Sequence, residues 1–424
     1  MNKLALNGGT PVRNEAFPRY VTIGEEEKRA VMEVLDSTVL SKFLAKWSPD
    51  YYGGPKVRQL EREWAEYFRV RHAVSVNSAT SGLYTAVGAA GVGPGDEVIV
   101  SPYTMSASAT AAVVYGGIPV FADIDPEIFC ITPESIEERI TPLTKAIIAV
   151  DIFGHPADMD EIVEIARDRD IIVIEDAAQA PGASYKGRYA GTLADIGVFS
   201  LNYHKTIQCG EGGIIVTEHD DLAERCRMIR NHAEGAVGAK GVSNLVNMVG
   251  FNYRMTEIEA AIAREQLKKL DTLLESRITA AKFLTEHLKA IPGITPPVVR
   301  PDVSHGYYVY PIRYNSEIIG IPRERFVEAL NAEGIPISSG YVEPIYMQPL
   351  YQRRIAFGRE GFPFTYHGYR GKVDYSPGIC PVTERMYYQE MMIADICHGN
   401  VSRSDQNDVI AAFEKVTANI GELV

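Results

Sequence analysis

The sequence predicts an α/β protein whose main sheet is largely parallel. Between about residues 72 and 219, short runs rich in Val and Ile alternate with stretches of helical period, as expected for buried parallel strands separated by helices. Turn signals such as Pro94-Gly95-Asp96 lie at the joints of this alternation. A chain of 424 residues is too long for one small core, so we expect two domains or one large domain with an appendage.

The individual elements follow from the same pattern. A helix is predicted over 158–169, where Met159, Ile162 and Ile165 share one face. Residues 220–233 also have a helical pattern, and the long period from Thr256 to Ile291 predicts a helix that links a large domain to a smaller one. The expected strands are 72–77, 97–101, 119–124, 146–153, 171–175, 198–201 and 213–217.

Beyond about residue 295 the pattern changes to that of an α+β module. Residues 307–312 are predicted to form a strand and 322–333 a helix, and the Gly-, Arg- and aromatic-rich residues 352–379 predict an ordered loop. We therefore divide the chain into an N-terminal arm (1–20), a large α/β domain (21–275) and a small α+β domain (276–424).

Composition and charge restrict the partners and the compartment. A net charge of -13 argues against nucleic acid or an anionic membrane as the main partner, because phosphate binding needs clustered Lys and Arg. The start of the chain lacks a signal-peptide pattern, and no apolar run of about 18 residues is present. The cysteines form no CxxC pair, so we expect a reducing cytoplasm and neither a metal site nor a disulfide framework. They are Cys130, Cys209, Cys226, Cys380 and Cys397.

Lys205 lies between a short apolar strand and a glycine-rich turn. Phe199-Ser200-Leu201 precedes it and Cys209-Gly210-Glu211-Gly212-Gly213 follows, a setting in which the backbone approaches a ligand closely. A lysine in a desolvated site loses its proton more easily, as a lysine that forms a Schiff base must. Most lysines are merely solvated surface groups, so this hypothesis depends on the neighbouring motifs.

An acid precedes this lysine at the end of another strand. Asp176 follows the apolar Ile171–Ile174 run, at the edge where open α/β sheets bind their ligands. A carboxylate there is placed to pair with the pyridinium nitrogen of pyridoxal 5'-phosphate (PLP). Asp176 is alternatively a helix cap or a surface acid, and Glu175 competes with it for the role.

A phosphate-binding segment completes the set. Residues 77–82, Asn-Ser-Ala-Thr-Ser-Gly, place hydroxyl and amide donors at the start of a predicted helix. The GxGxxG and Walker A sequences are absent, so the main sequence motifs that would indicate binding of NAD or of a nucleoside triphosphate are missing. A phosphate segment, an acid and a lysine in this order favour PLP.

Further short sequence motifs follow one another along almost the whole chain. They are residues 77–82, Gly93-Pro94-Gly95-Asp96-Glu97-Val98-Ile99, Pro102-Tyr103-Thr104, Asp123-Ile124-Asp125, Pro156-Ala157-Asp158-Met159-Asp160, Glu175-Asp176-Ala177-Ala178-Gln179, Lys205 with Gly210-Glu211-Gly212-Gly213, and Gly250-Phe251-Asn252-Tyr253-Arg254-Met255. In these blocks the chain resembles the DegT/DnrJ/EryC1/StrS family of PLP-dependent aminotransferases, which act on ketosugars and related cyclic ketones. The resemblance implies fold type I, the aspartate aminotransferase-like fold, and a homodimer.

The resemblance also implies roles for individual residues. Lys205 would bind the cofactor covalently and move the proton, Asp176 would pair with the ring nitrogen, and Gln179 would contact the phenolic oxygen. The remaining cofactor-binding residues that it implies are Ser78, Ala79, Thr80, Met105, Ser200, Asn202 and Asn252.

Several positions distinguish this chain from the pattern of the family. Met105 stands where many relatives place an aromatic residue over the cofactor ring, and a thioether also packs against a ring. Tyr308 and Tyr346 replace histidines associated with substrate binding. Arg254, which stands in one of the matching blocks, is either a candidate for holding the donor carboxylate or a structural ion-pair partner. Asn252 corresponds to a residue contributed by the neighbouring subunit, which implies shared active sites.

The predicted reaction is therefore transamination of a keto group on a polyhydroxylated ring. The resemblance implies glutamate or glutamine as the amino donor, with pyridoxamine 5'-phosphate formed in turnover, and a nucleotide-linked keto-sugar as the acceptor. A keto-cyclitol such as scyllo-inosose, or another antibiotic precursor, is the alternative. Sugar dehydratases of this family replace the lysine with histidine, so Lys205 favours transamination and His204 is expected to pack at a strand end. A non-catalytic PLP-binding regulator and an NAD-dependent oxidoreductase are the remaining alternatives.

Overall fold

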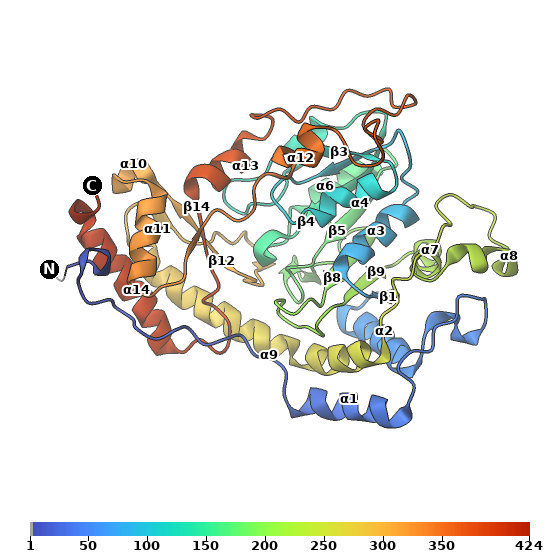
Figure 1. Cartoon of the computed structure of the whole chain (residues 1–424), viewed down its shortest axis with the longest axis horizontal. Coiled ribbons are helices and arrows are strands. Elements are labelled where there is room, and N and C mark those ends of the chain that lie inside the picture. The colour runs from blue at the N-terminus through green and yellow to red at the C-terminus, as the bar shows by residue number, and fades with distance from the viewer. Residues whose placement is uncertain (1–2) are drawn as a thin grey trace.

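A seven-stranded sheet forms the centre of the protein, in the order β1-β9-β8-β5-β4-β2-β3. The structure is a computed structural model that describes residues 3–424 (Figure 1). Strands β8, β5, β4, β2 and β3 pair in parallel, and β9 runs antiparallel to both of its neighbours. The sheet is thus mixed and mainly parallel, as predicted. Its strands are β1 (His72–Val76), β2 (Glu97–Val100), β3 (Ile118–Phe121), β4 (Thr144–Val150), β5 (Ile172–Asp176), β8 (Ile196–Ser200) and β9 (Gly213–Thr217).

Helices cover both faces of this sheet, which is why its strands are apolar on both sides. Side chains alternate along each strand. Val198 and Ile215 belong to the core that includes α3 and α7, whereas Phe199 and Ile214 belong to the core that includes α2 and α9. The helices around the sheet are α2 (Pro55–Phe68), α3 (Ala79–Ala89), α4 (Ala107–Val114), α5 (Pro133–Glu137), α6 (Met159–Arg167), α7 (Asp220–Arg230) and α8 (Val237–Lys240).

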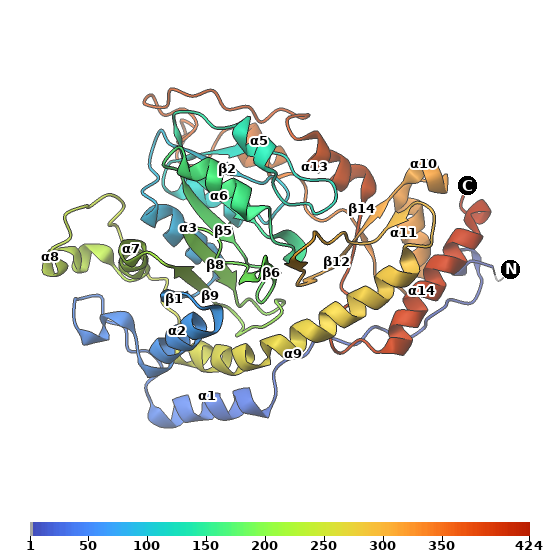
Figure 2. The same ribbon diagram turned by 180° about the vertical axis from the view of Figure 1, so that it is seen from behind.

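The long helix α9 (Glu257–Leu288) connects this layered region to a second core (Figure 2). It begins with a capping box, in which Thr256 and Glu259 satisfy each other's backbone N–H groups. Leu267 and Leu270 pack in the core beneath the sheet, while Leu284 and Leu288 pack in the second core. The predicted domain boundary between residues 275 and 276 lies inside this helix, and the division into domains stays a prediction.

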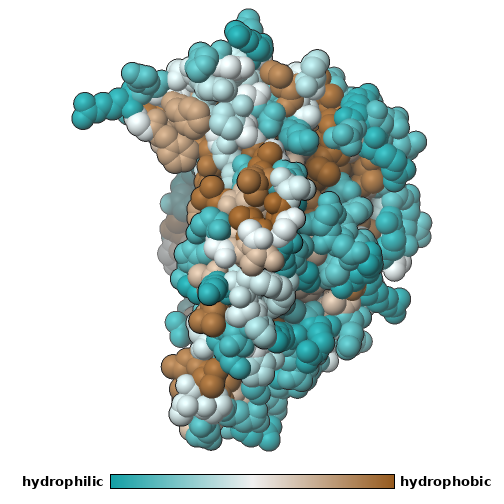
Figure 3. Space-filling model, turned by 90° about the vertical axis from the view of Figure 1, so that its right-hand side faces the viewer, coloured by the Kyte–Doolittle hydropathy of each residue, from teal (hydrophilic) through white to brown (hydrophobic). Residues whose placement is uncertain are grey.

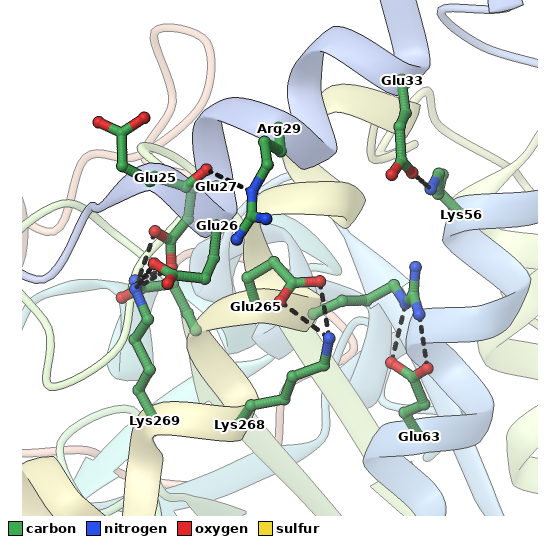
Figure 4. A network of polar contacts seen from close by, with 12 residues as sticks. Glu25, Glu26, Glu27, Arg29, Glu33, Lys56, Glu63, Glu265, Lys268 and Lys269 are labelled. Atoms are coloured by element: carbon green, nitrogen blue, oxygen red, sulfur yellow. Dashed lines mark hydrogen bonds and ion pairs between the residues drawn. The ribbon is translucent and has the colours of Figure 1, made fainter.

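Charged pairs attach helix α1 (Glu25–Ser37) and α2 to the first half of α9 (Figure 4). The carboxylate of the buried Glu27 lies 2.7 Å from Lys269 Nζ and accepts a 2.7 Å hydrogen bond from Gln266 Nε2. Lys56 Nζ lies 2.8 Å from the carboxylate of Glu33, which joins α2 to α1. These contacts fix the N-terminal helices beneath the sheet.

The second core is built on a four-stranded antiparallel sheet in the order β10-β12-β14-β13. The aromatic-rich segment that follows β13 returns to the large sheet, where Tyr346, Tyr351 and Tyr375 pack around Phe121. None of the helices formed by residues 3–424 combines the length and apolar character needed to cross a membrane. The remaining elements are β10 (Ile294–Thr295), β12 (Tyr310–Tyr314), β13 (Ser338–Ser339), β14 (Met391–Ala394), α10 (Ser316–Ile319), α11 (Arg323–Ala332), α12 (Pro349–Gln352), α13 (Pro381–Arg385), α14 (Arg403–Ala418), and the small sheet of β6 (Ser184–Tyr185), β7 (Arg188–Tyr189) and β11 (Val303–Ser304).

Two of the predicted strands extend into residues that form turns at the site. The strand expected to reach Phe153 ends at Val150, because Phe153 (φ 59°) and Gly154 (φ 99°) adopt left-handed conformations. The strand expected from Tyr307 begins at Tyr310, since Tyr307 also has a positive φ of 46°. The two turns are joined by hydrogen bonds, from Gly306 N to Gly154 O (2.7 Å) and from Tyr308 N to Phe153 O (2.8 Å).

Candidate active site

A cavity of about 170 Å³ opens at the carboxyl edge of the parallel strands. Val150, Asp176 and Ser200, the last residues of β4, β5 and β8, all contribute to its wall. This is the edge at which open α/β sheets bind their ligands. The lining residues are Ser78, Ala79, Thr80, Leu83, Thr104, Met105, Ala107, Val150, Asp176, Ala178, Gln179, Ser200, Asn202, His204, Lys205 and Glu211.

Lys205 is buried in this cavity, with 8% of its surface exposed. Burial lowers the pKa of its ammonium group from 10.5 to about 8, and the charge of Asp176 opposes part of this shift. Its Nζ atom lies 4.3 Å from the centre of the Tyr308 ring. The structure therefore brings together the predicted lysine, the predicted acid and Tyr308.

The lowered pKa predicts how the cofactor-free protein reacts with aldehydes. Only the neutral amine is nucleophilic, so labelling of Lys205 should rise with pH through a midpoint of about 8. At pH 7 the neutral fraction would exceed that of an ordinary lysine by about 300-fold. Reductive methylation between pH 6 and 10, quantified on the Lys205 peptide by mass spectrometry, measures this midpoint. A midpoint near 10.5 would show that the amine is not desolvated.

Asp176 is held in place by two hydrogen bonds. Its Oδ2 accepts from Ser108 Oγ (2.8 Å) and its Oδ1 accepts from the backbone N–H of Ala178 (3.2 Å). Burial raises the pKa of this carboxyl group, and both hydrogen bonds oppose that shift. Sequence reasoning missed Ser108, because nothing in its alanine-rich helix marks it as a partner of β5.

Glu175, the competing acid, points away from the cavity. Adjacent side chains of a strand point to opposite faces, so only one of the pair can face the ligand. The Oε2 atom of Glu175 accepts a 2.8 Å hydrogen bond from Leu193 N, and burial raises the pKa of this carboxyl group to about 7. The structure thus separates the two acids, and Asp176 is the one in the cavity.

The phosphate-binding segment forms the start of helix α3. Ser78 is the N-cap, and its Oγ accepts from Ser81 N (3.1 Å), while Ala79 and Thr80 are the first two helical residues. Their N–H groups have no acceptor within the helix, so they remain available to an anion. A side chain at Gly213 would place its Cβ 2.7 Å from Ala79 N, so glycine there lets β9 pack against this helix start.

Gln179 lines the cavity, and both the oxygen and the nitrogen of its amide are hydrogen-bonded within the protein. Its Oε1 accepts from Phe153 N (2.7 Å), and its Nε2 donates to the hydroxyl of Tyr341 (3.0 Å). Tyr341 comes from the segment after β13 and was not predicted, because the pair is 162 residues apart. No local pattern could have indicated this contact.

Some of the other predicted residues line the cavity and some do not. Met105 lines the cavity but is 59% exposed, and Asn202 donates from Nδ2 to Glu211 Oε1 (2.9 Å). Asn252, Arg254 and Tyr346 do not line the cavity. Asn252 is exposed and accepts from Arg254 Nε (2.7 Å). Tyr346 is fully buried, and its hydroxyl donates to Glu384 Oε1 (2.5 Å).

The residues of the cavity fit PLP at three separate points. A buried amine of lowered pKa suits its aldehyde, the Asp176 carboxylate suits its ring N–H, and the start of α3 suits its phosphate. When bound, PLP supplies an electron-withdrawing ring that stabilises negative charge on the carbon of an amine substrate.

The fold and this site define a PLP-dependent aminotransferase of fold type I. The family model described as the DegT/DnrJ/EryC1/StrS aminotransferase family matches residues 22–367. The chain belongs to this family.

Three known proteins illustrate the relationship. L-glutamine:2-deoxy-scyllo-inosose aminotransferase from Streptoalloteichus tenebrarius is 34% identical over 444 residues, covering 99% of each chain. GDP-perosamine synthase from Caulobacter vibrioides is 36% identical over 326 residues, covering 77% of this chain and 84% of its own. The solved structure of DesI in the presence of its TDP-sugar product has a TM-score of 0.82 and 27% identity, covering 99% of this chain and 97% of DesI.

Proposed function

We propose that the protein transfers an amino group from glutamine or glutamate to the keto carbon of a polyhydroxylated ring. The buried amine of Lys205, facing Asp176 at the carboxyl edge of the sheet, is the observation that carries this proposal. With a pKa of about 8, this amine both accepts and returns a proton near neutral pH, as a group that acts as base and then acid must.

We assign the other residues of the site as follows. Asp176 keeps the ring nitrogen protonated, and Ser108 holds its carboxylate in place. Residues 78–80 and Ser200 bind the phosphate, and Gln179 donates to the phenolic oxygen. Tyr308 lies over the amine of Lys205, beside any substrate that reaches that atom.

A keto-cyclitol is our first candidate for the acceptor. The cyclitol aminotransferase from S. tenebrarius aligns over 99% of both chains, including the aromatic-rich segment beyond residue 352. Among the described residues that line the cavity, Lys205 is the only lysine or arginine, so the cavity itself provides no further cation for a diphosphate. A neutral polyol needs no such cation.

A nucleotide-linked keto-sugar is the second candidate. GDP-perosamine synthase is 36% identical over the aligned region, and DesI, which shares the fold, was solved with a TDP-sugar. In this case the diphosphate would have to bind cations outside the cavity or from a second subunit.

We further propose that the protein forms a homodimer. Figure 3 shows apolar surface on the side of the molecule that carries α8. Leu44, Trp47, Leu245 and Val249, in the segments before and after α8 in sequence, are exposed apolar residues. Lys240 Nζ lies 4.0 Å from the centre of the Trp47 ring, so α8 adjoins the segment that carries Leu44 and Trp47. Asn252, three residues beyond Val249, would then reach the cavity of the second copy. A cytoplasmic location stays a prediction.

The experiment is a pair of half-reactions followed by absorbance. Glutamine or glutamate added to the PLP-loaded protein should convert it to the pyridoxamine phosphate form. Addition of scyllo-inosose should then restore the original spectrum, whereas a TDP-linked keto-sugar serves as the alternative acceptor. If only the nucleotide-linked sugar restores the spectrum, that sugar becomes the first candidate for the acceptor and the keto-cyclitol the second. No conversion with either donor would contradict the proposed function.

A further inference from the structure

The amide of Gln179 has one orientation in this structure, and two groups determine it. The backbone N–H of Phe153 can only donate, so the atom 2.7 Å away must be the oxygen Oε1. Nε2 therefore faces the Tyr341 hydroxyl, which accepts one of its two N–H groups at 3.0 Å. The second N–H stays available to a ligand in the cavity that Gln179 lines.

Tyr341 is itself firmly placed. Its ring packs edge-on against Phe153, with 5.0 Å between ring centres, and against Tyr103 at 6.0 Å. Burial raises the pKa of its hydroxyl, which therefore stays protonated at neutral pH. The hydroxyl accepts from Gln179 and keeps its own proton for a further acceptor.

Phe153 connects these contacts to the other wall of the site. Its backbone lies in the left-handed region, with φ 59°, which is uncommon for a residue other than glycine. Its N–H binds Gln179, and its carbonyl accepts from Tyr308 N at 2.8 Å. The aromatic packing of Tyr341 on Phe153 therefore supports the peptide that orients both Gln179 and Tyr308.

We propose that Tyr341 is a positioning residue for the cofactor. Its hydroxyl fixes the Gln179 amide so that the second N–H of Nε2 is directed to the phenolic oxygen of PLP. Without that hydroxyl, Nε2 loses a partner and the side chain gains rotational freedom. This inference rests on the proposed roles of Lys205 and Gln179.

Tyr341→Phe tests the proposal, because it removes the hydroxyl and keeps the ring against Phe153 and Tyr103. Loss of this one hydrogen bond should raise the dissociation constant of PLP by about fivefold. The absorbance of the lysine-linked cofactor, titrated against pH, should shift in the same direction as in Gln179→Ala. In the double variant the effect should be no larger than that of Gln179→Ala alone, since Tyr341 acts through Gln179.

Tyr375→Phe is the matched control. Tyr375 is another buried tyrosine, and its hydroxyl donates to Pro119 O (2.7 Å) in the core, remote from Gln179. This control should lose some thermal stability and keep the parental spectrum and PLP affinity. A parental spectrum and affinity in Tyr341→Phe, or full additivity in the double variant, would overturn the inference and leave the proposed function standing. A parental protein with no lysine-linked absorbance would overturn both.

Discussion

Replacing Lys205 with alanine should lower the rate of amino transfer by at least about 10⁴-fold. In the proposed function, this buried amine is the nucleophile for the cofactor aldehyde and the group that moves the proton. The variant should remain folded, because the change removes a desolvated cation. Its absorbance in the presence of excess PLP and its rate with glutamine and scyllo-inosose are the measurements. Lys268→Ala, at an exposed lysine on α9, is the control and should keep the parental rate.

Mixed dimers extend this test to the proposed sharing of sites. Subunits carrying Lys205→Ala would be mixed with subunits carrying Asn252→Ala. If Asn252 acts in the neighbouring copy, each mixed dimer contains one intact site. The activity of the mixture should then exceed the sum of the activities of the two single variants. Parental rates in Lys205→Ala would refute the catalytic assignment, and failure of the mixture to gain activity would refute the sharing of sites.

Asp176→Asn should lower the rate by about 10²- to 10³-fold while the protein still binds PLP. The amide keeps the shape of the carboxylate but removes the negative charge that we propose stabilises a protonated ring nitrogen. Steady-state rates with both substrates, together with the spectrum of the loaded variant, provide the measurement.

Glu175→Gln is the control for this change, because it alters the next residue of the same strand. Glu175 is also buried, but it accepts a hydrogen bond from Leu193 N on the other face. The variant should lose thermal stability and keep the spectrum of the parental protein. Equal losses of rate in the two variants would show that the position of the charge is unimportant and would contradict the assignment of Asp176.

The central sheet and the main groups of the site could be predicted from local sequence patterns. The strands were visible as Val- and Ile-rich runs because helices bury both of their faces. Lys205, Asp176 and residues 78–80 were visible because each lies at or shortly after the carboxyl end of such a strand. The choice between Asp176 and Glu175 needed the structure, since adjacent residues of a strand differ only in the face to which they point.

The parts that sequence reasoning missed depend on distant contacts. Helices α1 and α2 were not assigned, because they are fixed by pairs such as Glu27 with Lys269 and Glu33 with Lys56. Ser108 and Tyr341 likewise become meaningful only beside Asp176 and Gln179. The strands predicted over 146–153 and 307–312 included turn residues, because apolar residues such as Phe153 occupy left-handed turns that an apolar pattern does not reveal.

The most direct test of the central claim is to reduce the PLP-loaded protein with borohydride and map the modified peptide by mass spectrometry. We expect a single pyridoxyl adduct on the Nζ atom of Lys205. An adduct on another lysine, or none with PLP in excess, would contradict the assignment of this cavity as the active site.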